Sequence, residues 1–441
     1  MYASTYLKQI VNKQKRNLPV GIFSICSAHP FVIKTSFNFA KQHDIPILIE
    51  TTCNQVNQFG GYTNMKPNDF FNFVFELADS INLPVDQVFL GGDHLGPSVW
   101  KNEPVESAMD KSYDLIRHYI RAGYRKIHLD ASMACKGDPL PLPKELIVQR
   151  EALLCKAAVD ECEKIGLDIS EVVFVVGSEV PTPGGASVEE ETLSVSDVAE
   201  TRENISLTKE TFIAMGLEEA WNQTIAFVVQ PGVEFSDDNI YNYSRPEAKG
   251  LSKMIEDFDN LVFEAHSTDY QSRENLKNLV EDHFAILKVG PGLTFAFREG
   301  LFALTDIEKE IYPNFDQVKR SNLKEVLEEK MIEKPEYWKN HYSNNRDKSR
   351  FQRKYSFSDR SRYYWANSEI ILAYNKLIDN LSSIPIPYSL VSQYFPDQVK
   401  KFTAKQFQIQ PLDLIQGKIV DVLLDYATAC QQISFSNVLN K

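Results

Sequence analysis

Several features that define other protein classes are missing from this chain of 441 residues. Apolar runs such as residues 172–176 stop at about five residues, far short of the roughly 20 that a membrane-spanning helix needs. The apolar stretch near the N-terminus, residues 21–25, is too short for a secretory signal. The sequence therefore predicts a protein without a membrane span.

Paired cysteines and an excess of basic residues are also missing. The six cysteines show no Cys-x-x-Cys spacing and are interpreted as reduced thiols of a cytoplasmic protein. Lys and Arg number 47 against 60 for Asp and Glu, which gives a net charge of −13. Because a phosphate backbone requires a basic face, this balance argues against non-specific binding of nucleic acid.

One pattern repeats through the first 310 residues: a short apolar run ends in polar residues, and a loop and an amphipathic stretch follow. Continuous apolar strands that alternate with helices are typical of a parallel sheet covered on both faces. Eight such units predict a (β/α)8 TIM barrel. The alternative, an open doubly wound sheet, normally carries a Gly-x-Gly-x-x-Gly turn, which we do not find. The eight runs are residues 20–26, 46–49, 88–90, 126–129, 172–176, 224–229, 261–263 and 285–287.

The pattern stops at about residue 311, where prolines begin to separate helical stretches such as residues 367–381 and 412–429. We therefore predict two regions: a barrel over residues 1–310, and a helical extension over residues 311–441 that packs on the barrel. Within the extension, residues 339–362 hold eight basic side chains against two acidic ones.

Two sequence motifs at predicted strand ends combine carboxylates with histidines. Asp93 and His94 follow two glycines, and an Asp beside a His offers a general base next to a metal ligand. Glu264 and His266 are two residues apart and share one face of a strand, with donor atoms that suit Zn²⁺ or Mn²⁺. Taken alone, the first motif fits a tight turn equally well, and the second fits a buried ion pair.

Further candidates lie at other predicted strand ends. Glu179 precedes a loop rich in Pro and Gly. This loop could close over a ligand, but an ordinary surface loop would have the same composition. His29 and Asp130 are expected to line the same pocket, with Asp130 among the catalytic residues, and Asn54 is expected among the substrate-binding ones.

The phosphate-binding candidates come from the last predicted strand and from the basic segment. Gly290 exposes backbone amides at a helix N-terminus, and Lys288 adds a positive charge beside it. Lys288 as a Schiff-base lysine is a weaker alternative. Arg360 and Arg362 are expected to clamp a second phosphate, unless the segment is a solvated helix face.

Long sequence strings resemble the GatZ/KbaZ family of D-tagatose-1,6-bisphosphate aldolase subunits from galactitol and amino-sugar catabolism. The resemblance runs from about residue 18 to residue 430 and implies a TIM barrel that supports a smaller class II aldolase subunit. Some relatives are described as ketose-6-phosphate 4-epimerases that act alone. The strings that carry it are residues 27–30, 54–63, 91–97, 128–133, 228–235, 264–271 and 358–365.

A weaker resemblance connects the chain to the class II aldolases themselves. It implies that Asp93 is the acid/base and that Asp130 ends a strand of the site. It also implies a divalent metal held by His94, Glu179, Gln230 and His266. The departure is Gln230, which stands where those enzymes carry a histidine, so we expect weaker Zn²⁺ binding and better tolerance of Mn²⁺ or Mg²⁺.

Three functions remain open from the sequence. The chain is a component of a tagatose-bisphosphate aldolase, a metal-dependent 4-epimerase of tagatose and fructose 6-phosphates, or a non-catalytic scaffold subunit. The first two predict a sugar phosphate substrate, and we expect the protein to be an oligomer.

Overall fold

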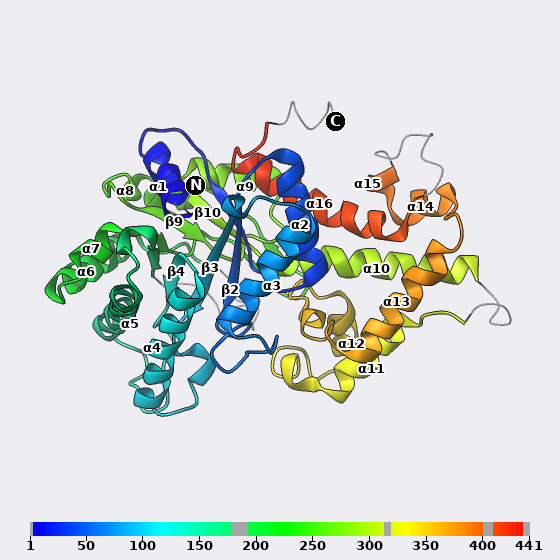
Figure 1. Ribbon diagram of the computed structural model, residues 1–441, viewed down its shortest axis with the longest axis horizontal. Coiled ribbons are helices and arrows are strands. Elements are labelled where there is room, and N and C mark those ends of the chain that lie inside the picture. The colour runs from blue at the N-terminus through cyan, green and yellow to red at the C-terminus, as the bar shows by residue number, and fades with distance from the viewer. Residues whose placement is uncertain (1–2, 178–192, 313–318, 400–408, 435–441) are drawn as a thin grey trace.

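A closed barrel of eight parallel strands forms the centre of the computed structural model, which describes residues 3–177, 193–312, 319–399 and 409–434 (Figure 1). The sheet closes where β1 pairs with β10, in a register that sets Ile22 beside Ile286. Each predicted apolar run overlaps one barrel strand, so the prediction of a TIM barrel is confirmed. The strands are β1 (Ile22–Ile25), β2 (Ile47–Thr52), β3 (Val88–Leu95), β4 (Lys126–Leu129), β5 (Val173–Val176), β6 (Thr224–Val228), β9 (Val262–Ala265) and β10 (Phe284–Val289).

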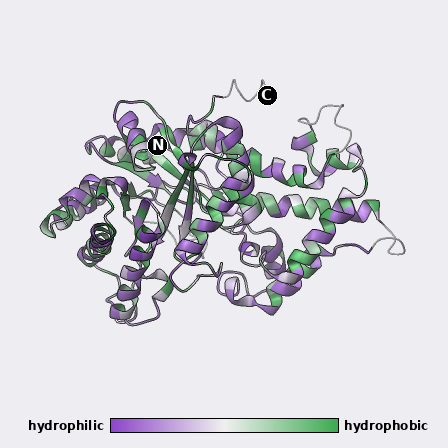
Figure 2. Ribbon diagram, in the orientation of Figure 1, coloured by the Kyte–Doolittle hydropathy of each residue, from purple (hydrophilic) through white to green (hydrophobic). Residues whose placement is uncertain are grey.

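The helices around the barrel each bury one face against the strands. In α4, for example, Leu115, Ile116, Tyr119 and Ile120 are all buried, and Gly123 ends the helix with a φ of 101°. Figure 2 shows green and purple residues alternating around these helices, as expected for amphipathic segments. The helices are α2 (Pro30–His43), α3 (Pro67–Ser80), α4 (Val105–Ala122), α5 (Lys144–Ile165), α6 (Val198–Ala214), α7 (Glu218–Asn222), α8 (Arg245–Ile255), α9 (Arg273–Glu281) and α10 (Pro291–Ile311).

The N-terminal helix α1 (Ala3–Gln14) covers one end of the barrel. Its apolar residues Leu7, Ile10 and Val11 belong to one buried cluster with barrel residues such as Phe89 and Ile225. This apolar plug closes the N-terminal ends of the strands, so a ligand is expected at their C-terminal ends. A short hairpin, β7 (Glu234–Phe235) with β8 (Ile240–Tyr241), follows β6.

The region after α10 is helical, and part of it packs against the barrel. Helix α16 contacts α2, α9 and α10, so it lies in the layer of helices around the strands (Figure 1). The division of the chain at residue 310 remains a prediction. Among the described helices, none is both long and apolar enough to span a membrane. The helical elements of this region are α11 (Leu323–Glu333), α12 (Arg346–Tyr355), the 3₁₀ turn η5 (Arg360–Tyr363), α13 (Ser368–Ser382), α14 (Tyr388–Tyr394), α15 (Pro396–Val399) and α16 (Pro411–Ala429).

Candidate active site at the C-terminal ends of the strands

Strand β3 delivers Asp93 and His94 into the barrel mouth, and the glycines before them make room for a neighbouring side chain. A Cβ atom on Gly91 would lie 2.8 Å from Cγ of Glu50, which crosses from β2. Both Asp93 and His94 are buried. The glycines therefore allow a charged side chain to pass beneath the candidate base and metal ligand.

His94 and His266 form a pair of imidazoles across the barrel mouth. His94 Nε2 lies 3.0 Å from His266 Nδ1, although 172 residues separate them in the sequence. The other ring nitrogen of each histidine faces a carboxylate: His94 Nδ1 lies 2.7 Å from Asp130, and His266 Nε2 lies 3.0 Å from Glu264. A carboxylate partner fixes the ring N–H on its own side, so the two facing nitrogens both present lone pairs.

Two lone pairs at this distance require a positive charge between them. Burial alone lowers the pKa of His94, but Asp93 and Asp130 outweigh burial and raise it. Burial lowers the pKa of His266 to about 3. Without a metal, the proton therefore belongs to His94, and His266 accepts a hydrogen bond from it.

His128 and Asp93 complete a set of four potential ligands. One donor atom from each of Asp93, His94, His128 and His266 lies within 4.8 Å of the others. His128 Nδ1 is 2.9 Å from Asp93 Oδ1, and His128 Nε2 is 3.1 Å from the carbonyl oxygen of Gly177. His128 was not expected in the site from the sequence, although it lies two residues before Asp130, a spacing that places two side chains on the same face of an extended segment.

A layer of buried ion pairs lies beneath the histidines. Lys126 contacts Glu50 at 2.8 Å and Glu264 at 2.7 Å. Lys288 contacts Asp93 at 2.9 Å and Glu264 at 3.2 Å, and it also contacts Glu50. Burial alone would lower the pKa of Lys288, but these carboxylates hold it well above its usual range. Such a lysine stays charged, so the geometry does not favour a Schiff-base nucleophile.

The charges of this network fit a divalent metal. Two lysines and the carboxylates of Glu50, Asp93, Asp130 and Glu264 leave a net charge of −2 when the imidazoles are neutral. A divalent cation beside His94 and His266 would neutralise that charge, and the nitrogen and oxygen donors suit Zn²⁺ or Mn²⁺. We therefore conclude that the residues present fit a divalent metal, without fixing its identity.

A cavity of about 90 Å³, which we call the reaction chamber, opens beside the candidate ligands. Its lining includes Asn54, Asp93, His94, His266, Lys288, Gly290 and Arg362, which are candidates from the sequence. The structure thus brings together side chains or backbone from β3, β10 and η5 and from the segments that follow β2 and β9. Arg362 reaches the chamber from the helical extension, where its Nη2 donates to the Tyr363 hydroxyl at 2.8 Å.

Three other candidates, Asp130, Gln230 and Arg360, do not line the chamber. Gln230 Oε1 accepts hydrogen bonds from the backbone amides of Gly232 and Val233, and Gln230 is not among the lining residues. Arg360 donates to the carbonyl oxygen of Tyr337 at 2.8 Å and does not line the chamber either. Glu179 lies outside the described residues. Their assigned roles remain predictions.

The backbone amides near Gly290 already have an anionic partner. Asp269 Oδ1 accepts from the amides of Gly290 at 2.9 Å and Gly292 at 2.7 Å. Burial raises the pKa of Asp269 to about 6, although these hydrogen bonds oppose the increase. A phosphate that used the same amides would have to replace this carboxylate.

Near Gly177, one buried carboxyl has no role in the network and yields a stability prediction. Glu151 is 2% exposed, its Oε1 has no hydrogen-bond partner among the residues that the structure describes, and burial raises its pKa to about 8. An unfolded glutamate titrates near pH 4.3, so the folded state holds its proton more tightly. The tighter binding of this proton stabilises the folded state. The stabilisation is complete below about pH 4.3 and is lost as the pH rises to about 8.

At pH 8.5 we expect Glu151→Gln to unfold at a higher denaturant concentration than the wild type, with a free energy of unfolding larger by up to about 5 kcal/mol. At pH 5 the difference should be much smaller. Urea unfolding at the two pH values measures the effect. Glu161, on the same helix, is equally buried but pairs with Arg121 at 2.7 Å, so Glu161→Gln is expected to lose stability at both values. A Glu151→Gln variant that is no more stable at pH 8.5 would contradict the prediction.

Known proteins resemble this chain over most of its length. The family model "D-tagatose-1,6-bisphosphate aldolase subunit GatZ/KbaZ-like" matches residues 7–431. A crystal structure described as a probable tagatose 6 phosphate kinase from Sinorhizobium meliloti 1021 is 40% identical, with a TM-score of 0.84 over 93% of this chain and 100% of that one.

Two aldolase structures also match, at lower similarity. The YdjI aldolase from Escherichia coli K12 is 14% identical, with a TM-score of 0.42 over 70% of this chain and 87% of that one. Fructose-bisphosphate aldolase from Campylobacter jejuni is 14% identical, with a TM-score of 0.43 over 86% and 92%. Similarity at this level carries no argument about the site.

Proposed function

The chain belongs to the GatZ/KbaZ-like family of D-tagatose-1,6-bisphosphate aldolase subunits, and from that membership we propose that it contributes a metal-dependent site of its own to the aldolase reaction. The observation that carries this proposal is the imidazole pair. His94 and His266 face each other at 3.0 Å, and each ring is oriented by a carboxylate on its far side. Carboxylate-oriented histidines that converge on one point are the usual surroundings of a catalytic metal.

The proposed reaction cleaves the bond between C3 and C4 of tagatose 1,6-bisphosphate. Asp93 takes the proton of the C4 hydroxyl, the C3–C4 electron pair moves toward the C2 carbonyl, and a proton then returns to C3. The products are glyceraldehyde 3-phosphate and glycerone phosphate. A divalent metal, when bound, would polarise the C2 carbonyl and stabilise negative charge on its oxygen.

The chain's own residues would orient these groups. Lys288 and His128 each lie 2.9 Å from Asp93 Oδ1, so they hold the carboxylate in one position. Burial alone would raise the pKa of Asp93, but Lys288 and the histidines keep it well below its usual range. Asp93 is therefore ionised, which is the form that a general base needs. Arg362 lines the chamber and would bind a phosphate group.

We further propose, from the family description, that the chain works with a smaller class II aldolase subunit in galactitol and amino-sugar catabolism. The test is an assay of triose phosphate release by the purified chain alone and by the chain mixed with that subunit. We expect the mixture to exceed the sum of the separate activities. Activity that the partner leaves unchanged would contradict the subunit role.

One observation favours a second candidate, the 4-epimerase. Of the chamber's lysine and arginine side chains, Lys288 is committed to three carboxylates, which leaves Arg362 for a phosphate. A single cation suits a ketose monophosphate better than a bisphosphate. Cleavage, rotation of the aldehyde and re-addition would invert C4 with the same groups. Formation of fructose 6-phosphate from tagatose 6-phosphate by the chain alone would support this candidate; no conversion with Zn²⁺, Mn²⁺ or Mg²⁺ would exclude it.

A further inference from the structure

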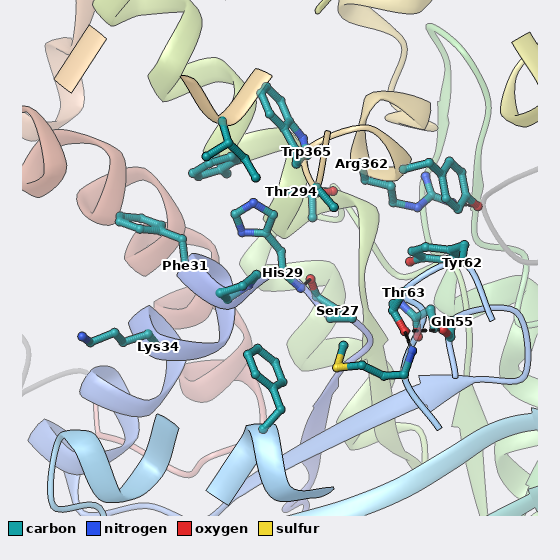
Figure 3. A pocket seen from close by; sticks show the side chains of 18 of the residues that line it. Ser27, His29, Phe31, Lys34, Gln55, Tyr62, Thr63, Thr294, Arg362 and Trp365 are labelled. Atoms are coloured by element: carbon teal, nitrogen blue, oxygen red, sulfur yellow. Dashed lines mark hydrogen bonds between the residues drawn. The ribbon is translucent and has the colours of Figure 1, made fainter. Parts of the chain in front are cut away.

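A second and much larger cavity, which we call the aromatic chamber, opens beside the reaction chamber (Figure 3). It has a volume of about 570 Å³, against about 90 Å³ for the reaction chamber. Its walls come from α2, α3, α10, η5 and α13, so the barrel and the helical extension enclose it together. The mainly apolar wall includes Phe31, Phe73, Phe297, Trp365, Ile370 and Tyr374.

The two chambers have part of their lining in common. Arg362 stands at this junction, and its guanidinium packs over the ring of Tyr363 at 4.5 Å. Because Arg362 lines both cavities, an anion in either cavity would contact the same guanidinium group. The residues that line both chambers are Cys26, Gln55, Tyr62, Gly290, Arg362 and Tyr363.

The size and the chemistry of the aromatic chamber favour a ligand other than the sugar itself. Its volume lies within the range of about 300–1,000 Å³ that is typical of small-molecule sites. A sugar chain carries a hydroxyl on nearly every carbon, and against Phe31, Ile370 and their neighbours those hydroxyls would lose hydrogen bonds that water provides. An aromatic ring would instead gain burial and ring contacts.

Two polar side chains in the chamber, His29 and Trp365, each have a buried ring nitrogen without a hydrogen-bond partner among the described residues. Figure 3 shows the His29 ring near the middle of the chamber, and its centroid lies 4.3 Å from that of Phe297. His29 Nδ1 is buried and has no hydrogen bond within the described part of the chain. A buried polar atom without a partner is rare in folded proteins and is explained if a ligand supplies the partner.

We propose that the aromatic chamber binds an aromatic anion, with its ring against Phe31, Phe297 and Trp365 and its anionic group at Arg362. Such a ligand would exclude the phosphate of a sugar phosphate from Arg362. An aromatic metabolite in the aromatic chamber would therefore compete with a sugar phosphate for Arg362 and lower the occupancy of the reaction chamber. The binding step itself needs neither a metal nor turnover, so this inference can fail or hold independently of the proposed function.

The test is titration of the full chain with 1-naphthyl phosphate, followed by the fluorescence of the naphthyl group. We expect saturable binding with one site per chain, and binding of inorganic phosphate or 1-naphthol at least tenfold weaker than that of the complete probe. Phe31→Ala should weaken the probe about tenfold, and Arg362→Met should weaken it at least as much. Leu372, on α13, is 68% exposed and does not line the chamber, so Leu372→Ala should leave the affinity unchanged.

Phe31→Leu keeps a large apolar side chain and serves as a second variant in case Phe31→Ala does not fold properly. We expect an affinity between those of the wild type and Phe31→Ala, with an unchanged melting temperature. The proposal is overturned if Phe31→Ala and Phe31→Leu both bind the probe as the wild type does. Equal binding of 1-naphthol and 1-naphthyl phosphate would also overturn it, since Arg362 would then have no part.

Discussion

Replacing His94 with alanine is expected to remove tight binding of a divalent metal and, with it, turnover. His94 supplies the nitrogen that faces His266 at 3.0 Å, and its other nitrogen is already held by Asp130. Loss of an orienting partner typically costs 10–100-fold in metal affinity, so loss of the ligand itself should cost at least about 100-fold. Metal analysis after equilibrium dialysis, together with triose phosphate release by the complex, measures both effects.

His118 offers a matched control for this substitution. It lies in α4 and does not belong to the metal-ligand groups of the described chain. His118→Ala should therefore keep both metal and activity. Under the scaffold hypothesis, His94→Ala would leave the activity of the complex intact, and that result would contradict a catalytic site in this chain.

The second large effect is expected from Asp93→Asn. The amide has nearly the shape of the carboxylate but cannot accept the proton of the C4 hydroxyl. General acid–base catalysis contributes about 10²–10⁴-fold, so we expect kcat to fall by that factor while metal affinity changes less than about tenfold. Steady-state kinetics at saturating metal separates the two quantities.

Asp130→Asn makes an informative comparison with Asp93→Asn. Asp130 lies 2.7 Å from His94 Nδ1 and orients that ring without contacting the facing nitrogens. We expect this variant to bind metal 10–100-fold more weakly and to regain activity when metal is added in excess. If excess metal restores Asp93→Asn in the same way, Asp93 acts as a ligand and not as the proton acceptor.

The fold was predictable because each barrel strand contains a buried apolar run, and alternating runs and amphipathic stretches fit few architectures. The meeting of His94 with His266 was predictable for a related reason. Both residues lie at the C-terminal ends of strands, and in a closed barrel those ends converge on one rim. Sequence separation therefore does not prevent contact between them.

The buried ion-pair layer was not predictable from the same reasoning. Lys126 begins the apolar run of β4, and Glu50 lies inside β2, so neither stands in the loop where strand-end chemistry is expected. Each is fully buried and compensated by charges from other strands. The sequence of one strand does not show which residue neutralises its buried charge, because that residue comes from another strand of the barrel.

Local backbone geometry explains the remaining differences. The side chain of Gln230 accepts hydrogen bonds from the backbone amides two and three residues later in the chain. Residue type alone does not reveal this contact. The amides of Gly290 and Gly292 looked available for phosphate, but Asp269 reaches them from 21 residues earlier in the chain. Arg360 and Arg362 are neighbours in one 3₁₀ turn, yet only Arg362 lines the chamber.

X-ray absorption spectroscopy of the metal-loaded chain would show whether His94 and His266 share one divalent ion. With Zn²⁺ bound, our account predicts one ion per chain and a first shell that includes at least two imidazole nitrogens at about 2.0–2.1 Å. In His94→Ala, one of those nitrogens should be lost. A chain that retains no stoichiometric ion after dialysis, or an ion whose first shell contains no imidazole, would contradict the account.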